Sequence, residues 1–369
     1  MSPKGNTIPL AMRNTPFLIW LLASCLLFSC STENEPDPQE PQEDQSEEAT
    51  GEDTEETPLV FPFQTAPLPP PMVGVDALFA EDVPYDQYAD TNFDIFIPPS
   101  AEPTGLVIYI HGGGFDGGDK DFIYNNSFPD HIAELLENKV AVASINYRKI
   151  LPGDSDGVLK SLTDSKRALQ YIRSQAEGLN IDKSKVILFG SSAGASTALW
   201  IATNNEMAEP ASTDAVLRES TRVQGIALNA TQSSLDFEGR WMTDVFGEYD
   251  PVFTEVVALF GEAYFFSLYG VTTWEEYNTE EVAAYRAQID MLSLISSDDP
   301  EIWVTNTGPA NGVPDSVGSW NHHGNHAREI KEYADAAGVH NVAVYGDPIL
   351  YADPSGEFYL DFIYRKLGL

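Results

Sequence analysis

The sequence predicts an α/β fold in which a mostly parallel central sheet carries helices on both faces. Two observations lead to this prediction: short apolar runs alternate with segments of helical periodicity, and two of these runs end in glycine. Uninterrupted apolar runs are typical of strands that are buried on both faces, as in parallel sheets. The chain has 369 residues, which is enough for one large α/β domain with extensions.

The expected elements follow one another from about Phe93 to the C-terminus. Apolar runs predict strands at residues 106–111, 140–147, 185–190, 222–230, 301–307 and 341–345. Helical spacing of apolar residues predicts helices at residues 131–138, 159–176, 193–204, 326–337 and 358–366. Strands that alternate with helices in this way favour a parallel sheet covered on both faces.

Residues 233–298 interrupt the alternation with an aromatic-rich stretch of mainly helical pattern. We expect a helical insertion after the sixth strand of the sheet. Because ligand sites of open α/β folds lie at the carboxyl ends of the strands, the insertion is interpreted as a cap over a pocket. The alternative is an ordinary helical insertion that forms a small core of its own.

The N-terminus has the layout of an export signal. Residues 1–15 are polar and carry two positive charges, and residues 16–30 form an apolar run that ends at a cysteine. This run is shorter than the roughly 20 residues that span a bilayer. We therefore predict a signal peptide at 1–29, an acidic disordered tether at 30–65 and the folded domain at 66–369.

Small residues before a cysteine resemble the lipobox of bacterial lipoproteins, in which the cysteine becomes the lipidated first residue. Cys25 fits the consensus better, but Cys30 ends the apolar run and directly precedes the acidic stretch. We favour lipidation of Cys30, with export and anchoring at the cell envelope, on the outer membrane or the periplasmic face. An ordinary signal peptide with an incidental cysteine is the alternative.

Acidic residues dominate the charge of the chain. There are 57 Asp and Glu against 20 Lys and Arg, and residues 31–57 alone hold 12 acids and no base. Residues 58–369 still have a net charge of -27. Such a surface repels phosphates and anionic lipids, so nucleic-acid binding is excluded and only the lipid anchor is expected to contact a membrane. No cysteine follows Cys30, which excludes a thiol nucleophile in the folded domain.

The candidate nucleophile is Ser192, at the centre of the G-x-S-x-G pattern formed by residues 190–194. The pattern directly follows an expected strand and directly precedes an expected helix. This is the context of a nucleophile elbow, where a sharp turn exposes the serine beside a helix N-terminus. The alternative is a glycine-rich turn whose serines only cap the helix.

A second motif, His-Gly-Gly-Gly-Phe at residues 111–115, follows an earlier strand. Glycines leave backbone N–H groups accessible to a substrate oxygen, and such donors stabilise the oxyanion of acyl transfer. The N–H groups of Gly113, Gly114 and Ala193 are the candidate donors. His111 ends a strand at the start of this loop, so we assign it a structural role.

Together these motifs resemble the carboxylesterases of the α/β-hydrolase superfamily, in the hormone-sensitive-lipase and feruloyl-esterase-like branch. The resemblance includes Asn146-Tyr147-Arg148 and Asp164 and covers roughly residues 75–369. It implies the α/β-hydrolase fold, a Ser–His–Asp triad, hydrolysis of carboxylic esters and no cofactor. The expected substrate is a small-molecule or glycan-linked ester.

The end of the chain departs from that family. Its histidine usually follows the last strand, here 341–345, but that strand is followed by Asp347 and no histidine. Instead, three of the six histidines lie at 322–326, where the acid usually stands.

We therefore expect the two roles to be exchanged, which a triad defined by geometry permits. His326 begins a helix, which constrains its direction, whereas His322 and His323 are on the loop and can turn inward. Of these two, His323 is slightly favoured as the base. Asp347 could orient the base, with Asp315 and Asp236 as the alternative acids.

Other interpretations remain open for the histidine cluster. Imidazoles are good zinc ligands, but no Glu follows in the HExxH pattern and adjacent histidines are badly placed for joint ligation, so no metal site is assigned. If the histidines only support a helix and a loop, the protein is a degenerate hydrolase that binds without turnover. Within the enzymes, a peptidase or lipase of the same fold is the competing hypothesis.

Overall fold

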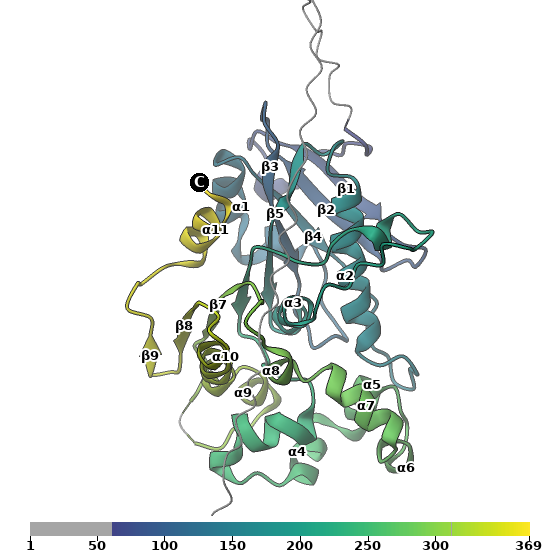
Figure 1. Ribbon diagram of the computed structural model, residues 1–369, viewed down its shortest axis with the longest axis vertical. Helices are drawn as coiled ribbons and strands as arrows, with labels where there is room; N and C mark the ends of the chain where they lie inside the picture. Colours follow the sequence, from purple (N-terminus) through teal and green to yellow (C-terminus); the bar gives the residue numbers. More distant parts are fainter. Residues whose placement is uncertain (1–60, 311) are drawn as a thin grey trace, which may run out of the picture. The chain divides into compact units, whose positions relative to one another are not determined.

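The computed structural model describes residues 61–310 and 312–369 (Figure 1). The predicted signal peptide, both cysteines and most of the predicted tether lie outside these residues, so those predictions stand as expectations. Among the described residues, no single helix is long and apolar enough to cross a membrane. One bent pair of segments, Phe253–Phe260 with Glu262–Tyr277, passes the same criteria of length and composition.

A nine-stranded sheet forms the centre of the described domain, in the order β1-β2-β4-β3-β5-β6-β7-β8-β9. Strands β3 to β8 pair in parallel, while β1, β2 and β9 join antiparallel at the two edges. The strands are β1 Leu78–Pro84, β2 Asn92–Ile97, β3 Thr104–Ile110, β4 Val140–Ile145, β5 Ile181–Ser191, β6 Gly225–Asn229, β7 Glu301–Asn306, β8 Asn341–Tyr345 and β9 Tyr351–Ala352.

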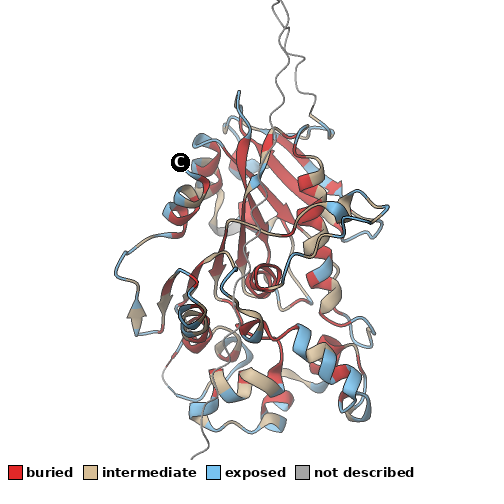
Figure 2. Ribbon diagram, in the orientation of Figure 1, coloured by how far each residue is buried: buried red, intermediate tan, exposed pale blue. Residues whose placement is uncertain are grey.

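The apolar runs become central strands because both of their faces are buried. Along β3, Leu106 and Ile108 pack into one hydrophobic cluster, whereas Val107 and Tyr109 pack into another on the opposite face. Successive side chains of a strand point to opposite faces, so a continuous apolar run supplies two cores at once. Figure 2 shows these central strands as almost entirely buried.

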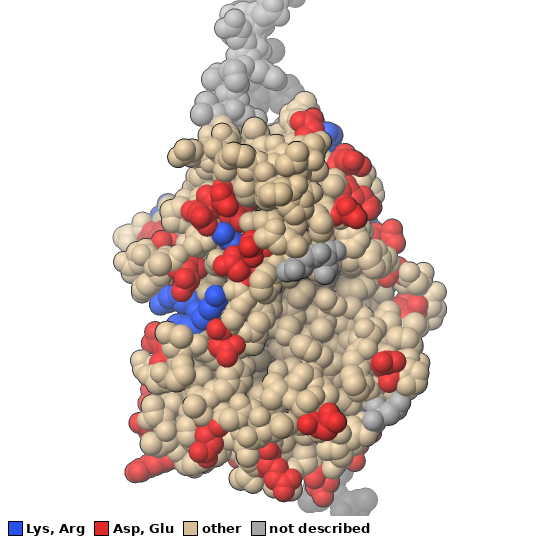
Figure 3. Space-filling view, turned by 180° about the vertical axis from the view of Figure 1, so that it is seen from behind, with Lys and Arg blue, Asp and Glu red and all other residues tan. Residues whose placement is uncertain are grey.

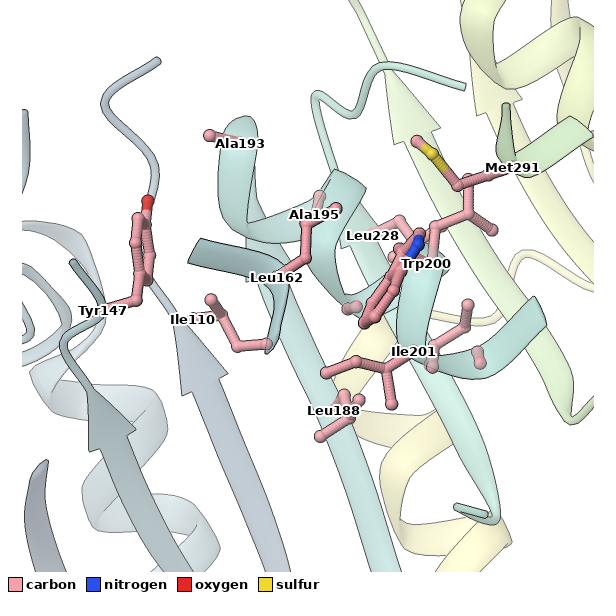
Figure 4. Packing of buried hydrophobic residues seen from close by; sticks show 14 of the residues in the cluster. Ile110, Tyr147, Leu162, Leu188, Ala193, Ala195, Trp200, Ile201, Leu228 and Met291 are labelled. Atoms are coloured by element: carbon pink, nitrogen blue, oxygen red, sulfur yellow. The ribbon is translucent and has the colours of Figure 1, made fainter. Parts of the chain in front are cut away.

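Helices cover both faces of the sheet. The helices α1 and α11 pack on one face, and α2, α3 and α10 pack on the other (Figure 1). On the face covered by α2, α3 and α10, Leu188 of β5 lies beside Ile201 of α3 (Figure 4). These helices are α1 Pro129–Glu137, α2 Leu159–Ser174, α3 Ala193–Thr203, α10 Gly324–Ala337 and α11 Tyr359–Leu367.

A helical insertion separates β6 from β7 and fills the lower part of Figure 1. Ion pairs join the beginning of the insertion to its end: Arg286 contacts Asp236 at 2.6 Å, and Arg240 contacts Asp290 at 2.9 Å. The insertion contains the helical turns Phe237–Val245 and the helices α4 Phe253–Phe260, α5 Glu262–Tyr269, α6 Trp274–Tyr277, α7 Glu280–Gln288 and α8 Met291–Leu294. The short helix α9, Val317–Asn321, lies between β7 and α10.

The predicted fold class is confirmed, including the insertion after the sixth strand. The sequence analysis did not predict β1, β2 and β9, the strands that pair antiparallel. It also did not predict α9, in a stretch that was expected to be a loop.

Figure 3 views the molecule from behind and shows acidic side chains scattered over that face, with few Lys and Arg side chains among them.

Candidate active site

Ser192 stands at the turn between β5 and α3, with φ 50° and ψ −121°. Glycines make this turn possible: a Cβ on Gly190 would lie 2.3 Å from the carbonyl oxygen of Gly194, and one on Gly194 would lie 2.0 Å from that of Ile110. The N–H of Ser192 donates to the carbonyl oxygen of Asn229 at 2.9 Å. A serine held at positive φ between a buried strand and a helix has the geometry of a nucleophile elbow.

The imidazole of His322 lies next to this serine. The distance from Ser192 Oγ to His322 Nε2 is 2.9 Å, within the range for direct proton transfer. His322 ends α9, and its backbone N–H donates to the carbonyl oxygen of Gly318 at 3.0 Å. A Cβ on Gly308 would lie 2.3 Å from the carbonyl oxygen of His322, so this position must remain glycine for the loop to approach.

The ionisation of His322 suits a base. Partial burial lowers its pKa below the ordinary value of 6.5, because desolvation disfavours the charged imidazolium. The ring is therefore neutral near pH 7, and Nε2 accepts a proton when Nδ1 carries the other hydrogen. Among the described residues, no side chain or carbonyl group forms a hydrogen bond with Nδ1.

The glycine loop after β3 lies against the serine. A Cβ on Gly112 would meet the carbonyl oxygen of Ser191 at 2.8 Å and the Cβ of Ser192 at 3.0 Å. Gly113 has φ 116°, and its carbonyl oxygen accepts from the N–H of Gly117 at 2.9 Å, which closes a tight turn. Within the described part of the chain, the N–H groups of Gly113 and Gly114 have no acceptor. They are available donors beside the nucleophile.

His111 supports the loop, as the sequence analysis expected. Its Nδ1 lies 2.7 Å from the carbonyl oxygen of Gly112, and its ring stacks on Tyr147 with centroids 4.4 Å apart. The Tyr147 hydroxyl donates to the carbonyl oxygen of His111 at 3.0 Å. Burial lowers the pKa of His111 to about 4, so the ring is neutral and serves as packing.

The Asn146-Tyr147-Arg148 motif also has a supporting role. Arg148 makes a bidentate ion pair with the Asp164 carboxylate, at 2.8 and 2.7 Å. Asn146 accepts from the backbone N–H of Lys120 at 2.8 Å. These contacts fix the segment after β4 beside the glycine loop.

A cavity of about 580 Å³ opens above Ser192 and His322. The insertion provides an apolar wall, and a polar side is formed by the glycine loop and α9. Tyr264 of α5 joins the two, because its hydroxyl donates to the carbonyl oxygen of Gly114 at 3.0 Å. The wall consists of Leu235, Phe237, Phe260 and Leu268; the polar side includes Asp116, Gln232 and Asn321.

A family model described as BD-FAE matches residues 93–310, more than half of the chain. The chain belongs to the BD-FAE family. This confirms the resemblance to the carboxylesterase-like branch of the α/β-hydrolases, and the matched region contains both Ser192 and the glycine loop.

Two curated proteins are similar in sequence to this BD-FAE member over about a third of its length or less. It is 34% identical over 108 residues to the probable N-octanoylanthranilate hydrolase AqdA2 of Rhodococcus erythropolis, covering 27% of this chain and 22% of that protein. It is 33% identical over 135 residues to the non-reducing polyketide synthase atr1 of Stereocaulon alpinum, covering 33% of this chain and 5% of the synthase. The chain thus spans less than a quarter of either relative's length.

Among solved structures, a truncated carbohydrate esterase from gut microbiota superposes with a TM-score of 0.57. It is 18% identical and covers 80% of this chain and 98% of its own. At that identity the likeness shows the fold.

His323 does not reach the serine, so the slight preference for it in the sequence analysis is corrected. His323 is buried, and its Nδ1 accepts from the backbone N–H of Asn325 at 3.1 Å, which caps α10. Its ring packs against Phe246, with centroids 5.3 Å apart. His322 ends one helix and His323 begins the next, so their side chains diverge.

His326 also has a structural position in this BD-FAE member. It is fully buried; its Nδ1 accepts from the N–H of Ser233 at 3.2 Å and its Nε2 lies 3.0 Å from the carbonyl oxygen of Trp320. Burial lowers its pKa to about 3.

Among the described residues, no group of three His, Cys, Asp or Glu side chains could hold a metal ion.

The three candidate acids lie elsewhere, which corrects the expectation that Asp347 orients the base. Asp347 is exposed in the turn where the chain folds back from β8 into β9. Asp315 is exposed and bonds Ser319, and Asp236 pairs with Arg286. None forms a hydrogen bond with His322 in the described structure.

Sequence reasoning missed Tyr264, Gln232 and Phe237 as cavity residues. The aromatic richness of the insertion was the available signal for a wall, but it could not select the ring that reaches Gly114. Ala193, named as a third donor, is buried as the first residue of α3, where its N–H has no partner within the helix.

Proposed function

We propose that the protein hydrolyses carboxylic esters through an acyl-enzyme at Ser192. The observation that carries this proposal is the 2.9 Å contact between Ser192 Oγ and His322 Nε2, beside N–H groups of the glycine loop that have no acceptor among the described residues. Membership in the BD-FAE family supports the reaction class. A serine that lines a cavity, a neutral base and oxyanion donors are the parts that acyl transfer requires.

The steps follow from these positions. Ser192 Oγ attacks the ester carbonyl carbon while its proton passes to His322 Nε2. The N–H groups of Gly113, Gly114 and Ala193 stabilise the oxyanion, and each such donor is worth about 2.7–4 kcal/mol. His322 then protonates the departing alcohol oxygen as the C–O bond breaks. Water repeats the sequence on the acyl-enzyme, which releases the acid and restores Ser192.

This proposal assigns the base to a dyad. No carboxylate bonds His322 in the described residues, so the ring is positioned by the end of α9 and by Gly308. An orienting acid normally fixes the tautomer of the base and stabilises its charged form. Here the backbone fixes the position, and we expect a slower reaction than that of a complete triad.

For the substrate, we propose a small ester with an apolar acyl group and a neutral, hydroxyl-bearing alcohol. The apolar wall of the cavity would take the acyl chain, and Asp116, Gln232 and Asn321 would bond the alcohol portion. The net charge of -37 disfavours anionic alcohols such as phosphorylated sugars. A glycan-linked ester fits this description.

Labelling with a fluorophosphonate tests the proposal. The probe phosphonylates a serine only when that serine is activated, so the wild-type protein should be labelled and Ser192→Ala should not. Ser191→Ala is the matched control, because Ser191 Oγ contacts Asn229 Nδ2 at 3.5 Å and lies away from His322. Equal loss of labelling in both variants, or no labelling of the wild type, would overturn the assignment.

We also propose that the domain is exported and anchored through lipidation of Cys30. The apolar run that ends at Cys30 and the acidic stretch after it support this proposal. Cys30→Ser should release the protein into the soluble fraction, whereas Cys25→Ser should not. An unmodified mature N-terminus well downstream of Cys30, seen by mass spectrometry, would contradict it.

A further inference from the structure

A second cavity, of about 440 Å³, lies on the face of the sheet that α1 and α11 cover. Helix α11 packs on β5 and β6. The segment between β9 and α11 runs outward at the left edge of Figure 1, so Val342 and Val344 of β8 line an open space. This cavity and the one above Ser192 share no lining residue. It is therefore separate from the proposed catalytic site.

Aromatic side chains dominate its lining. Phe189 stacks on Tyr359 with centroids 4.9 Å apart, and Trp303 meets the same tyrosine edge-on at 5.8 Å. Phe128 and Phe358 complete the aromatic part of the wall. Rings of this kind favour an aromatic guest, and their electron-rich faces also attract cations. The volume lies within the range of sites for small molecules.

Two carboxylates stand at this cavity, and one of them keeps its charge available. Glu357 is neutralised by Arg365, at 2.6 Å. Asp353 accepts from the N–H of Ser355 at 2.9 Å and forms no ion pair with Lys or Arg in the described part of the chain. Burial tends to raise the pKa of Asp353, but the hydrogen bonds from Ser355 outweigh it and the pKa lies below its ordinary value. Asp353 is thus an anion beside an aromatic cavity.

We propose that this cavity binds a small aromatic molecule that carries a positive charge, such as an arylalkylammonium ion. The ring would enter between Phe128, Trp303 and Tyr359, and the ammonium would face Asp353. The negative charge of the whole chain favours the same class of ligand. It also disfavours the acidic segment 31–57, with 12 acids and no base, as the occupant.

Calorimetric titration of the full chain with 2-phenylethylammonium, at low ionic strength, tests the proposal. The neutral probe 2-phenylethanol has the same ring and chain length, and it should bind about two- to fivefold more weakly, the usual worth of a partly exposed charge pair. Asp353→Asn should remove this difference while leaving 2-phenylethanol unaffected. Glu332→Gln, which removes an exposed charge on the opposite face, should leave both affinities unchanged.

A cavity-filling substitution locates the site. Val344→Trp should abolish binding of both probes and leave fluorophosphonate labelling of Ser192 intact. Ala352→Trp fills the cavity from the exposed edge strand and serves if the first variant does not fold. Equal affinity for the two probes, binding that survives a folded filled variant, or binding that disappears after labelling of Ser192 would each overturn the proposal.

Discussion

Ser192 adopts a backbone conformation that a residue with a side chain rarely occupies, and such a conformation costs roughly 1–3 kcal/mol. The surrounding contacts maintain it: the N–H of Ser192 donates to the carbonyl oxygen of Asn229, and Gly190 and Gly194 allow the close backbone approaches on either side of the serine. The strain keeps Oγ at the end of β5 and next to His322. Position, more than acidity of the serine, therefore accounts for the proposed reactivity.

Replacing His322 should separate the two neighbouring histidines by function. His322→Ala removes the group that accepts the serine proton, so kcat for a short aryl ester should fall by about 10²–10⁴-fold with folding intact. His323→Ala removes the cap of α10 and should reduce the free energy of unfolding by about 1 kcal/mol or more while retaining turnover. Steady-state rates and urea denaturation of both variants check this; the reverse assignment of losses would refute it.

The candidate acids should have little effect. Because Asp347 and Asp315 form no bond with His322, Asp347→Asn and Asp315→Asn should each keep kcat/KM within about threefold of the wild type. A triad acid, by contrast, costs about 10⁴-fold when it is changed to Asn. A loss of that size in either variant, measured with the same ester, would show that the carboxylate approaches His322 during the reaction.

At the residue scale, the sequence predicted the nucleophile and the glycine loop more reliably than it predicted which histidine is the base. Ser192 and the glycine loop could be predicted because their motifs specify a turn that only these residues permit. The choice between His322 and His323 depends on the end of α9 at one and the start of α10 at the other. A five-residue helix such as α9 has too few residues to show a periodicity, so the direction of each ring could not be derived.

At the scale of elements, Tyr264 joins the insertion to the glycine loop. The Tyr264 hydroxyl bonds the carbonyl oxygen of Gly114, which helps to fix the peptide beside the Ser192 nucleophile. The insertion therefore shapes the cavity and also fixes a part of the loop that would stabilise charge.

Tyr264→Phe should reduce kcat more than it raises KM, because the lost bond positions the loop without being required for substrate entry. A hydrogen bond of this kind is worth about 0.5–1.5 kcal/mol, or roughly two- to tenfold in rate. Tyr285→Phe is the matched control, since its hydroxyl joins α7 to the carbonyl oxygen of Leu268, away from the loop. An unchanged kcat in Tyr264→Phe would leave the tyrosine as a packing residue only.

The edge strands could not be predicted as the central ones were. β3, β4 and β5 are apolar on both faces, whereas β1 has an exposed residue at several positions and β9 has only two residues. Their pairing with β2 and β8 is a tertiary event that leaves little pattern in the local sequence.

For the whole molecule, two buried histidines give the stability a defined pH dependence. Burial lowers the pKa of His111 to about 4 and that of His326 to about 3, from 6.5 in the unfolded chain. Below pH 6.5 the unfolded state binds protons that the folded state does not, so the free energy of unfolding should fall as the pH decreases from 7 to 5. The two sites together account for a slope of at most roughly 2.7 kcal/mol per pH unit.

Urea denaturation at fixed pH values between 5 and 8 measures this slope. His326→Asn should be less stable than the wild type at pH 8, and its slope below pH 6.5 should be smaller by about 1.4 kcal/mol per pH unit. An equal slope in wild type and variant would mean that the buried imidazole does not remain neutral in the folded protein.

The exposed turn between β8 and β9 has a practical consequence for altering the molecule. All groups proposed to act on the ester lie between His111 and His322, while Ile349 and Leu350 of this turn are each 54% exposed. A reporter domain could be spliced in at residues 347–350 with its ends close together, and ester hydrolysis should persist. Because the segment after this turn lines the aromatic cavity, the inserted domain should affect ligand binding there before it affects ester hydrolysis.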